Sequence, residues 1–346
     1  MRWYDYTRQQ LAGTAATTLN VDPITHAISG IALARALPGH LLPRSQVILL
    51  VGLTMLPDAD YILTFISDTT YLQYHRGITH SILMLPLWTW LIYALISKTR
   101  SAIPAWLIAA AIVLHIGLDL ITSFGTMILA PFSDWRATLD LVFIIDPLFT
   151  ACLLIPLLLA FIWKRHARKL AIVSFVSMCA YLGLTLMMHH AAMQLARNDQ
   201  PSALEYHALP MPFSPFRWQL IASYSEYYSQ TAVDFLPDFP GNTLFFPDSF
   251  VHQFSGNVQP LTRLAWRQFP AMRAQTDIRK LPGTAFYSWF ARFPVLLEHR
   301  SELWIFGDLR FGAGSNPDSP FRLEINEGKQ PRAWLIWHGN QRSELR

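Results

Sequence analysis

Uncharged apolar runs, each close to the length of a membrane span, dominate the first 190 residues of the chain. A bilayer core about 30 Å thick needs about 20 apolar helical residues to cross it. Four runs approach this length, at 77–97, 101–118, 147–163 and 170–188. Two shorter apolar pieces, at 24–37 and 45–57, carry polar residues at one end. We therefore expect a mainly α membrane protein, a polytopic helical bundle with four full spans plus one or two short or partial spans.

After about residue 190 the pattern changes to that of a soluble domain. Short aromatic and aliphatic runs follow Pro-rich turns, which predicts strands at 286–290, 303–306, 321–325 and 333–337. The piece 261–275 predicts a helix, so we expect a C-terminal α+β domain. Three parts result: a polar N-terminal extension (1–21), a transmembrane metal-site domain (22–190) and an extracytoplasmic α+β domain (191–346).

Composition supports the membrane assignment. Of the 346 residues 52% are hydrophobic and only 14% are charged, against about 25% charged in soluble domains. The net charge of +4 does not indicate nucleic acid, because the Lys and Arg residues lie in short loops between apolar runs. Cys152 and Cys179 both lie inside apolar runs, so a metal site would have to use His and carboxylate ligands.

The charges of the loops predict the orientation. One set of connections carries Lys and Arg without any acid, namely Arg35, Arg44, Lys98, Arg100, Lys164, Arg165, Arg168 and Lys169. The other set, 57–81 and 119–147, is rich in Asp. Because basic loops stay in the cytoplasm, we expect a multi-pass membrane protein with an extracytoplasmic or periplasmic C-terminal domain. Residues 1–20 are polar, so no cleavable signal peptide is expected.

Ionisable residues gather at the ends of the apolar runs that this orientation places on the outer side. Such residues are costly in a membrane and are functional candidates. His115 and Asp119 are four residues apart and share one face of a helix. Our predicted metal ligands are His26, Asp58, His75, His115 and Asp119. Imidazole and carboxylate ligands suit Zn first, with Mn or Fe as alternatives, and five ligands allow one ion or two ions that share a carboxylate.

Three further residues are predicted to be catalytic. Asp60 or His80 would be the general acid or base, or would hold the ligands in place. Arg76 would hold an anionic group of the substrate, although it could instead only pair with an acid.

Several of these residues also have structural interpretations. Asp22 and Asp146 each precede a proline, which is typical of a helix N-cap. His26 alone could be hydrogen-bonded to a neighbouring helix, and Asp58 with Asp60 could be a turn or the DxD motif of a sugar-nucleotide enzyme. The polar cluster 122–126 could end a helix or line the floor of the site.

Five ordered motifs resemble the YdjM-like family. They are Asp-Pro-Ile-Thr-His-Ala at 22–27, Leu-Pro-Asp-Ala-Asp at 56–60, His-Arg-Gly-Ile-Thr-His-Ser at 75–81, His115-xxx-Asp119 followed by 122–126, and Asp146-Pro147. The family's members are predicted inner-membrane metal-dependent hydrolases, some reported as regulated by the SOS repressor. The resemblance implies this location and activity for residues 22–150.

The order of the ligands is also similar to that in bacterial phospholipase C and S1/P1 nuclease, which cleave phosphoesters with a zinc cluster. That similarity implies that His26, Asp58, His75, His115 and Asp119 correspond to the first ligands of such a cluster. No later His and Glu pair follows Asp119 at close spacing. We therefore expect one or two ions.

The function that we expect is a membrane-bound metal-dependent hydrolase acting on a phosphoester or a lipid-linked substrate at the outer face of the bilayer. The chain lacks HExxH, G-x-S-x-G and Walker A motifs, which argues against zincin, serine hydrolase and P-loop chemistry. A non-enzymatic alternative is a metal-stabilised scaffold or a metal-handling protein. A transporter is less favoured, because no inverted repeat is visible.

Overall fold

The computed structural model describes residues 23–39, 41–237, 258–261, 264–312, 320–337 and 342–345. The polar extension 1–21 and the predicted cap at Asp22 lie outside these residues. The chain divides into two compact units. We call residues 21–188 with 212–215 the membrane unit, and residues 189–211 with 216–346 the sheet unit.

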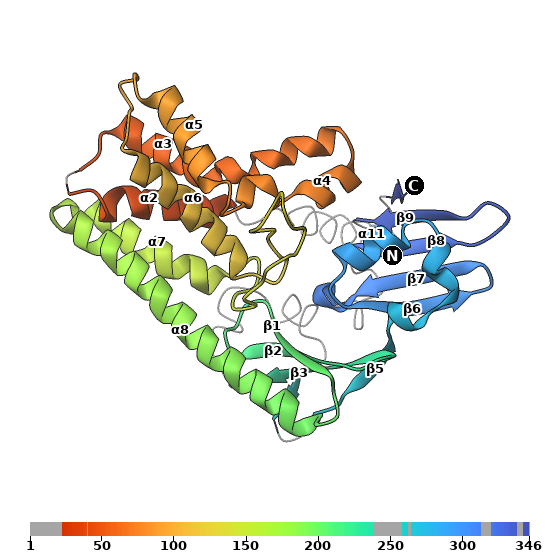
Figure 1. The fold of residues 1–346 in the computed structure, drawn as a ribbon. Coiled ribbons are helices and arrows are strands. Elements are labelled where there is room, and N and C mark those ends of the chain that lie inside the picture. The colour runs from red at the N-terminus through yellow and green to blue at the C-terminus, as the bar shows by residue number, and fades with distance from the viewer. Residues whose placement is uncertain are drawn as a thin grey trace, which may run out of the picture. The chain divides into compact units, whose positions relative to one another are not determined.

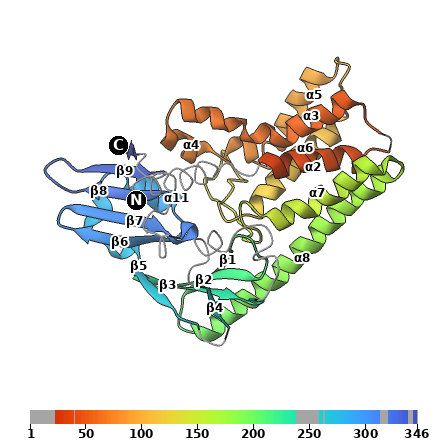
Figure 2. The same ribbon diagram turned by 180° about the vertical axis from the view of Figure 1, so that it is seen from behind.

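The membrane unit is helical throughout its regular structure (Figures 1 and 2). Its elements are α2 (Pro23–Ala36), α3 (Arg44–Met55), η1 (Leu56–Phe65), α4 (Asp68–Tyr74), η2 (Ile78–His80), α5 (Leu85–Ile96), α6 (Ala105–Leu120), α7 (Pro147–Ile162), η3 (Lys164–His166) and α8 (Ala167–Asp199). The last of these helices continues into the sheet unit, so the two units share one helix.

The expectation of a bundle with four full spans is wrong. Within the described residues, two helices are long and apolar enough to cross a membrane, Arg44–Phe65 and Lys164–Asp199. A third span results only if Asp68–His80 and Leu85–Ile96 count as one, although these two pieces are bent by 78°. The first of the two long helices was predicted to be a short or partial span.

The reason lies in where each apolar run becomes helical. The run 77–97 is interrupted after His80, and Pro86 in the first turn of α5 leaves a helix of 12 residues, about 18 Å long. Helices α6 and α7 have 16 residues each, or about 24 Å, which is less than a bilayer core of about 30 Å. In contrast, η1 continues α3 and makes one apolar helix of 22 residues.

Small and hydroxyl side chains bring the helices of the membrane unit together. A Cβ atom on Gly30 of α2 would lie 2.5 Å from Oγ1 of Thr54 and 2.9 Å from Cα of Val51, so only glycine allows α2 and α3 to approach so closely. The hydroxyls of Ser174 and Ser177 on α8 donate hydrogen bonds to the carbonyls of Leu153 and Cys152 on α7. These contacts join α2 to α3 and α7 to α8.

The sheet unit contains two five-stranded sheets. The first contains β1 (Glu205–Pro210), β2 (Arg217–Ser223), β3 (Tyr227–Asp234), β4 (Val258–Pro260) and β5 (Arg267–Pro270). The second contains β6 (Pro294–Arg300), β7 (Leu303–Asp308), β8 (Arg322–Asn326), β9 (Arg332–Ile336) and β10 (Arg342–Leu345). The second sheet is an antiparallel meander in the order β10-β9-β8-β7-β6, whereas β3 and β4 pair in parallel in the first.

Two predictions for this unit are wrong. The piece 261–275, predicted to be helical, forms β5 and the short helix η4 (Met272–Ala274) where it is described. The aromatic run 286–290, predicted to be a strand, belongs to the helix α11 (Thr284–Phe290). Its buried residues Thr284, Tyr287 and Phe290 recur every three positions, so packing on one helical face outweighs the strand preference of aromatic residues. The other three predicted strands overlap β7, β8 and β9.

Candidate metal centre

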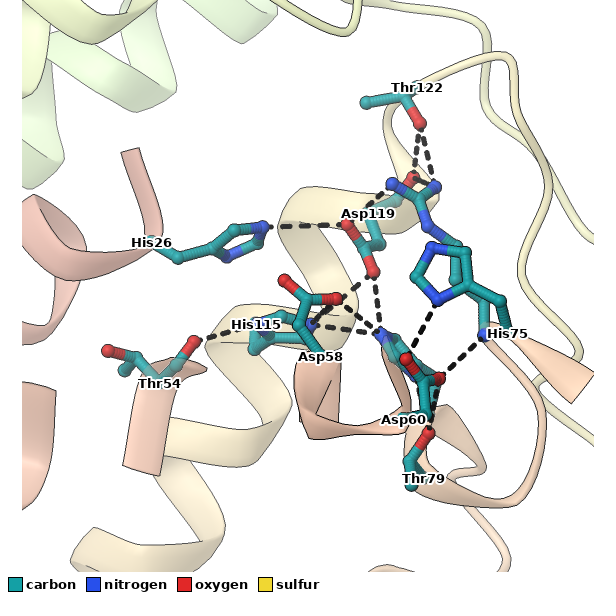
Figure 3. Close-up of polar contacts among 11 residues, drawn as sticks. His26, Thr54, Asp58, Asp60, His75, Thr79, His115, Asp119 and Thr122 are labelled. Atoms are coloured by element: carbon teal, nitrogen blue, oxygen red, sulfur yellow. Dashed lines mark hydrogen bonds and ion pairs between the residues drawn. The ribbon is translucent and has the colours of Figure 1, made fainter. Parts of the chain in front are cut away.

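The candidate metal centre lies inside the membrane unit, where side chains from five segments meet (Figure 3). All eight predicted site residues are in or beside it. They are His26 of α2, Asp58 and Asp60 of η1, His75 and Arg76 after α4, His80 of η2, and His115 and Asp119 of α6. The geometry separates them into a group of four that could hold an ion and a surrounding group that orients the side chains of these four.

The group of four consists of Asp58, His80, His115 and Asp119, whose candidate ligand atoms all lie within 4.8 Å of one another. The Nε2 atoms of His80 and His115 lie 3.0 Å apart. Oδ2 of Asp119 is 3.0 Å from Nε2 of His80 and 3.4 Å from Nε2 of His115. Oδ1 of Asp58 is 3.4 Å and 3.5 Å from the same two nitrogens. Two imidazoles and two carboxylates therefore point at one place.

A backbone contact determines the tautomer of neutral His115. Its Nδ1 lies 2.7 Å from the carbonyl oxygen of Thr54. Because a carbonyl oxygen only accepts, Nδ1 must carry the hydrogen and donate it. The Nε2 atom of neutral His115 is then left with a lone pair that faces the group of four.

A chain of side-chain hydrogen bonds has the same effect on His80. The hydroxyl of Thr79 donates to Oδ2 of Asp60 at 3.0 Å, so its hydrogen is already used. Nδ1 of His80, 2.9 Å from the same hydroxyl oxygen, must therefore be the donor in that contact. Neutral His80 also presents the lone pair of Nε2 to the group of four, as metal-binding histidines do when an outer partner holds the other nitrogen.

The centre thus gathers several acceptor atoms beside Arg76, whose Nη2 atom is 2.9 Å from Oδ1 of Asp119. Among the described residues, Oδ1 of Asp58 and both carboxylate oxygens of Asp119 have no hydrogen-bond partner. The side chains of His80, His115 and Asp119 are 0% exposed and that of Asp58 is 25% exposed. Buried acceptors that face one another are costly unless a cation lies between them. The residues present therefore fit a divalent ion.

Asp60 orients the centre. Its Oδ1 atom lies 2.9 Å from Nδ1 of His75, and its Oδ2 atom accepts from the backbone N–H of Arg76 at 3.1 Å as well as from Thr79. Three donors satisfy this carboxylate, in contrast to Asp119. Asp58, Asp60 and His75 also form a second group with ligand atoms within 4.8 Å of one another, and the two groups share Asp58.

The remaining predicted ligand, His26, lies at the edge of the group of four. Its Nε2 atom is 3.5 Å from Oδ1 of Asp119, and its ring stacks on that of His115 with centroids 4.0 Å apart. The prediction placed His26 and His75 among the ligands and His80 among the catalytic residues. The geometry instead brings His80 into the group of four and leaves the other two histidines beside it.

Arg76 lies inside the protein and is directed at Asp119. Its Nη2 atom is 2.9 Å from Oδ1 of Asp119, and its Nη1 atom donates to the hydroxyl of Thr122 at 3.1 Å. The backbone of Arg76 has a φ of 59°, a left-handed conformation that is rare for a residue with a side chain and is common at functional sites. The guanidinium is 0% exposed, which favours positioning of Asp119 over contact with a substrate.

The sequence did not single out Thr79 or Thr54. Thr79 lies between Gly77 and His80 in the motif 75–81, so its place in that motif was a signal that could have been used. Thr54 contributes only its backbone carbonyl, which any residue could supply, so no signal existed. Thr122 belongs to the polar cluster 122–126 that the sequence did single out. Its hydroxyl donates to the carbonyl of Asp119 and accepts from the guanidinium of Arg76.

The predicted structural role of Asp146 is confirmed. Its side chain accepts hydrogen bonds from the backbone N–H groups of Leu148 and Phe149 and caps α7. It also accepts one from the hydroxyl of Tyr181 at 2.6 Å. Asp146 is therefore not a member of the metal centre.

Similarity to known proteins was found for the part of the chain that contains the candidate metal centre. The uncharacterized protein YfhP of Bacillus subtilis (strain 168) is 29% identical over 138 residues, which cover 37% of this chain and 42% of that protein. The match thus spans less than half of the relative's length. No solved structure matches the chain. Residues 21–192, about half of the chain, match the family described as YdjM inner membrane protein, and the chain belongs to this family.

Proposed function

We propose that this protein is a metal-dependent hydrolase of the inner membrane. In this proposal Asp58, His80, His115 and Asp119 bind one divalent ion, with Zn as first choice, and the substrate is a phosphoester or a lipid-linked ester at the outer face of the bilayer. We also propose several passes through the membrane and a periplasmic sheet unit. The observation that carries the proposal is the convergence of two carboxylate oxygens with two imidazole nitrogens. Contacts with Thr54 and Thr79 set the tautomers of neutral His115 and His80, so that both Nε2 atoms bear lone pairs.

The charge of the centre supports a divalent ion. The carboxylates of Asp58, Asp60 and Asp119 face a single cationic side chain, Arg76, among the described contacts. With neutral imidazoles the cluster therefore carries two negative charges in a buried setting. An uncompensated buried charge is strongly unfavourable, and a doubly charged cation compensates both.

A divalent ion bound there would supply Lewis acidity to water and to a phosphoryl or carbonyl oxygen. The residues of the chain have separate roles around it. Arg76 and Thr122 hold Asp119 in place, and the Thr79 and Asp60 side chains hold His80. We assign proton transfer to the pair of His75 and Asp60, because the bond from Nδ1 of His75 to Asp60 leaves its Nε2 atom available as a base.

The surroundings of Asp58 favour a substrate from the lipid phase. Asp58 lies seven residues before Phe65, the end of a helix long enough to span a membrane. Ile62 and Phe65 on this segment are exposed. Asp58 is also the most exposed member of the group of four, so the site is most accessible from this side.

Metal content is the first test. Purified full-length wild type should hold at least one divalent ion per chain, whereas His115→Ala should hold at least about tenfold less, because one of four ligands is lost. His190→Ala, an exposed histidine on α8, is the matched control and should retain the wild-type content. Retention of the ion by His115→Ala would overturn the metal assignment.

Turnover is the second test. Wild type and both variants are assayed with a soluble phosphodiester, a soluble phosphomonoester and phospholipid vesicles. We expect hydrolysis by wild type and His190→Ala, and a loss of about 100-fold or more in His115→Ala. Equal rates in all three proteins would exclude this centre as the active site.

A second candidate is a non-enzymatic role in which the cluster stabilises the membrane unit. The complete burial of His80, His115 and Asp119 favours this alternative, because a structural ion needs no open side. Protonated imidazoles paired with the two carboxylates could even close the cluster without a metal. Full metal content with no turnover would support the scaffold, and no metal in wild type would support the ion-pair cluster.

A further inference from the structure

A second site lies in the membrane unit at the turn between α7 and α8. An open hollow of about 460 Å³ is lined by Trp163, His166, Lys169, Leu170 and Val173. This volume is in the range of small-ligand sites. Two of the lining residues, His166 and Lys169, carry donor groups, and the other three are apolar, so these residues suit an amphipathic ligand.

The turn is strongly basic and has no acidic partner. Lys164, Arg165, Arg168 and Lys169 are all exposed, and no Asp or Glu occurs between residues 147 and 198. Nε of Arg168 donates to the carbonyl of Ala36 at the end of α2, which adds the neighbouring Arg35 to the same end of the unit. Among the described residues none of these cations forms an ion pair with a carboxylate.

The position of the cations on α8 is unfavourable unless an anion is present. A helix N-terminus carries a partial positive charge and prefers acidic side chains. The first turn of the 33-residue α8 contains no acid, and it is surrounded by Lys164, Arg165, Arg168 and Lys169. Such a conflict with a local rule is typical of a functional site, and a bound anion would relieve it.

The apolar side of the hollow identifies the kind of anion. Trp163 directly follows the apolar helix α7 and is 57% exposed, and Val173 lies in the second turn of α8 and is 47% exposed. Trp at this position is typical of the boundary between headgroups and acyl chains, and basic pockets between membrane helices bind anionic lipid headgroups. A soluble anion would use the basic side and leave the apolar side uncovered.

We propose that this hollow binds an anionic phospholipid. His166 and Lys169 donate to the phosphate of the headgroup, and the charge of the neighbouring Lys164 attracts the same phosphate. The phosphate also compensates the N-terminus of α8. Trp163, Leu170 and Val173 contact the glycerol and the first acyl carbons. The site lies on different elements from the metal centre and does not depend on the proposed hydrolase activity.

Thermal unfolding of the full-length protein in detergent tests this site. The additives are dioleoyl phosphatidylglycerol, dioleoyl phosphatidylcholine and inorganic phosphate. In wild type, phosphatidylglycerol should raise the unfolding midpoint about 5 °C more than phosphatidylcholine does, and phosphate alone should have little effect. Lys164→Gln with Lys169→Gln should lose most of this difference, measured from the double variant's own midpoint.

The matched control is Lys98→Gln with Arg100→Gln, which removes two exposed charges from the turn between α5 and α6. This control should keep the wild-type shift. An equal loss in both double variants would mean a general charge effect and would overturn the site. Phosphate alone reproducing the full shift would overturn the lipid assignment, as would equal stabilisation by the two lipids. If a double variant does not fold, native mass spectrometry of wild type decides, with preferential retention of phosphatidylglycerol supporting the site.

Discussion

Asp119 in the membrane unit and Asp308 in the sheet unit are both buried carboxylates beside an arginine, yet their surroundings differ. Asp308 accepts hydrogen bonds from the backbone N–H groups of Arg292, Phe293 and Arg310, and from Nε of Arg310 at 2.7 Å. Asp119 faces Arg76, but its two oxygens have no hydrogen-bond partner among the described residues, and its Oδ2 atom is directed at the Nε2 atoms of His80 and His115.

The difference distinguishes a buried carboxylate that stabilises the fold from one that is available to a ligand. Four donors satisfy the Asp308 carboxylate, which ties the strand β7 to the turn before β6. The Asp119 carboxylate is held by one cation and left open to another. Buried polar groups in proteins are nearly always satisfied, so the oxygens of Asp119 and Asp58 without a hydrogen bond are candidate positions for a ligand.

The largest effect is expected when each of the two aspartates is replaced by asparagine. Asp119→Asn should lose the bound metal ion almost completely, because a charged ligand is replaced by a neutral amide. Asp308→Asn should keep the metal ion but should destabilise the sheet unit by about 3–5 kcal/mol, because Arg310 is left as an unpaired buried charge. Metal analysis and thermal unfolding with and without a chelator measure both effects.

Treatment with a chelator distinguishes the roles of Asp119 and Asp308 further. Removal of the metal ion should lower the unfolding midpoint of wild type and of Asp308→Asn, and it should leave that of Asp119→Asn unchanged. A chelator effect that is the same in all three proteins would mean that Asp119 and Asp308 do not differ in function.

The next effect concerns the residue that orients His80. Thr79→Val keeps the shape of the side chain but removes the acceptor for Nδ1 of His80 and the donor to Asp60. We expect the affinity for the metal ion to fall by about 10–100-fold, measured by competition with a chelator of known affinity. Thr79→Ser retains the hydroxyl and should remain close to wild type. If the serine variant binds as weakly as the valine variant, packing rather than hydrogen bonding is the cause.

The smallest effect tests how closely α2 and α3 approach. A methyl group in Gly30→Ala would meet Thr54 and Val51 at less than 3 Å, so we expect a loss of about 1–3 kcal/mol in stability. Gly52→Ala on α3 meets no heavy atom within 4 Å and should be neutral or stabilising by up to about 1 kcal/mol. Thermal unfolding of the two variants provides the measurement, and equal midpoints would argue against the close contact at Gly30.

The candidate centre was more accessible from the sequence than the fold was. Ionisable residues inside apolar runs are rare, so His26, Asp58 and the pair His115 and Asp119 stood out without any structure. The choice of His75 over His80 as a ligand could not be decided in this way. It depends on which nitrogen of each imidazole is already bonded. The bonding partners, Thr79 for His80 and Asp60 for His75, are visible only in the structure.

The spans were harder to predict because a hydropathy pattern reports apolar length but not helical continuity. The run 77–97 breaks at the turn after His80, and the run 45–57 continues as a helix to Phe65. Aromatic residues also misled the prediction at 286–290, where burial on one side of α11 decides the structure.

By itself, the order of residues indicated which half of the chain is apolar and which side chains are candidates to bind a cation, because both follow from the polarity of single residues. Tertiary structure alone decided which of these side chains share one point in space and which nitrogens face it. Those properties arise from hydrogen bonds between segments as far apart as Thr54 and His115, and no local pattern in the chain encodes them.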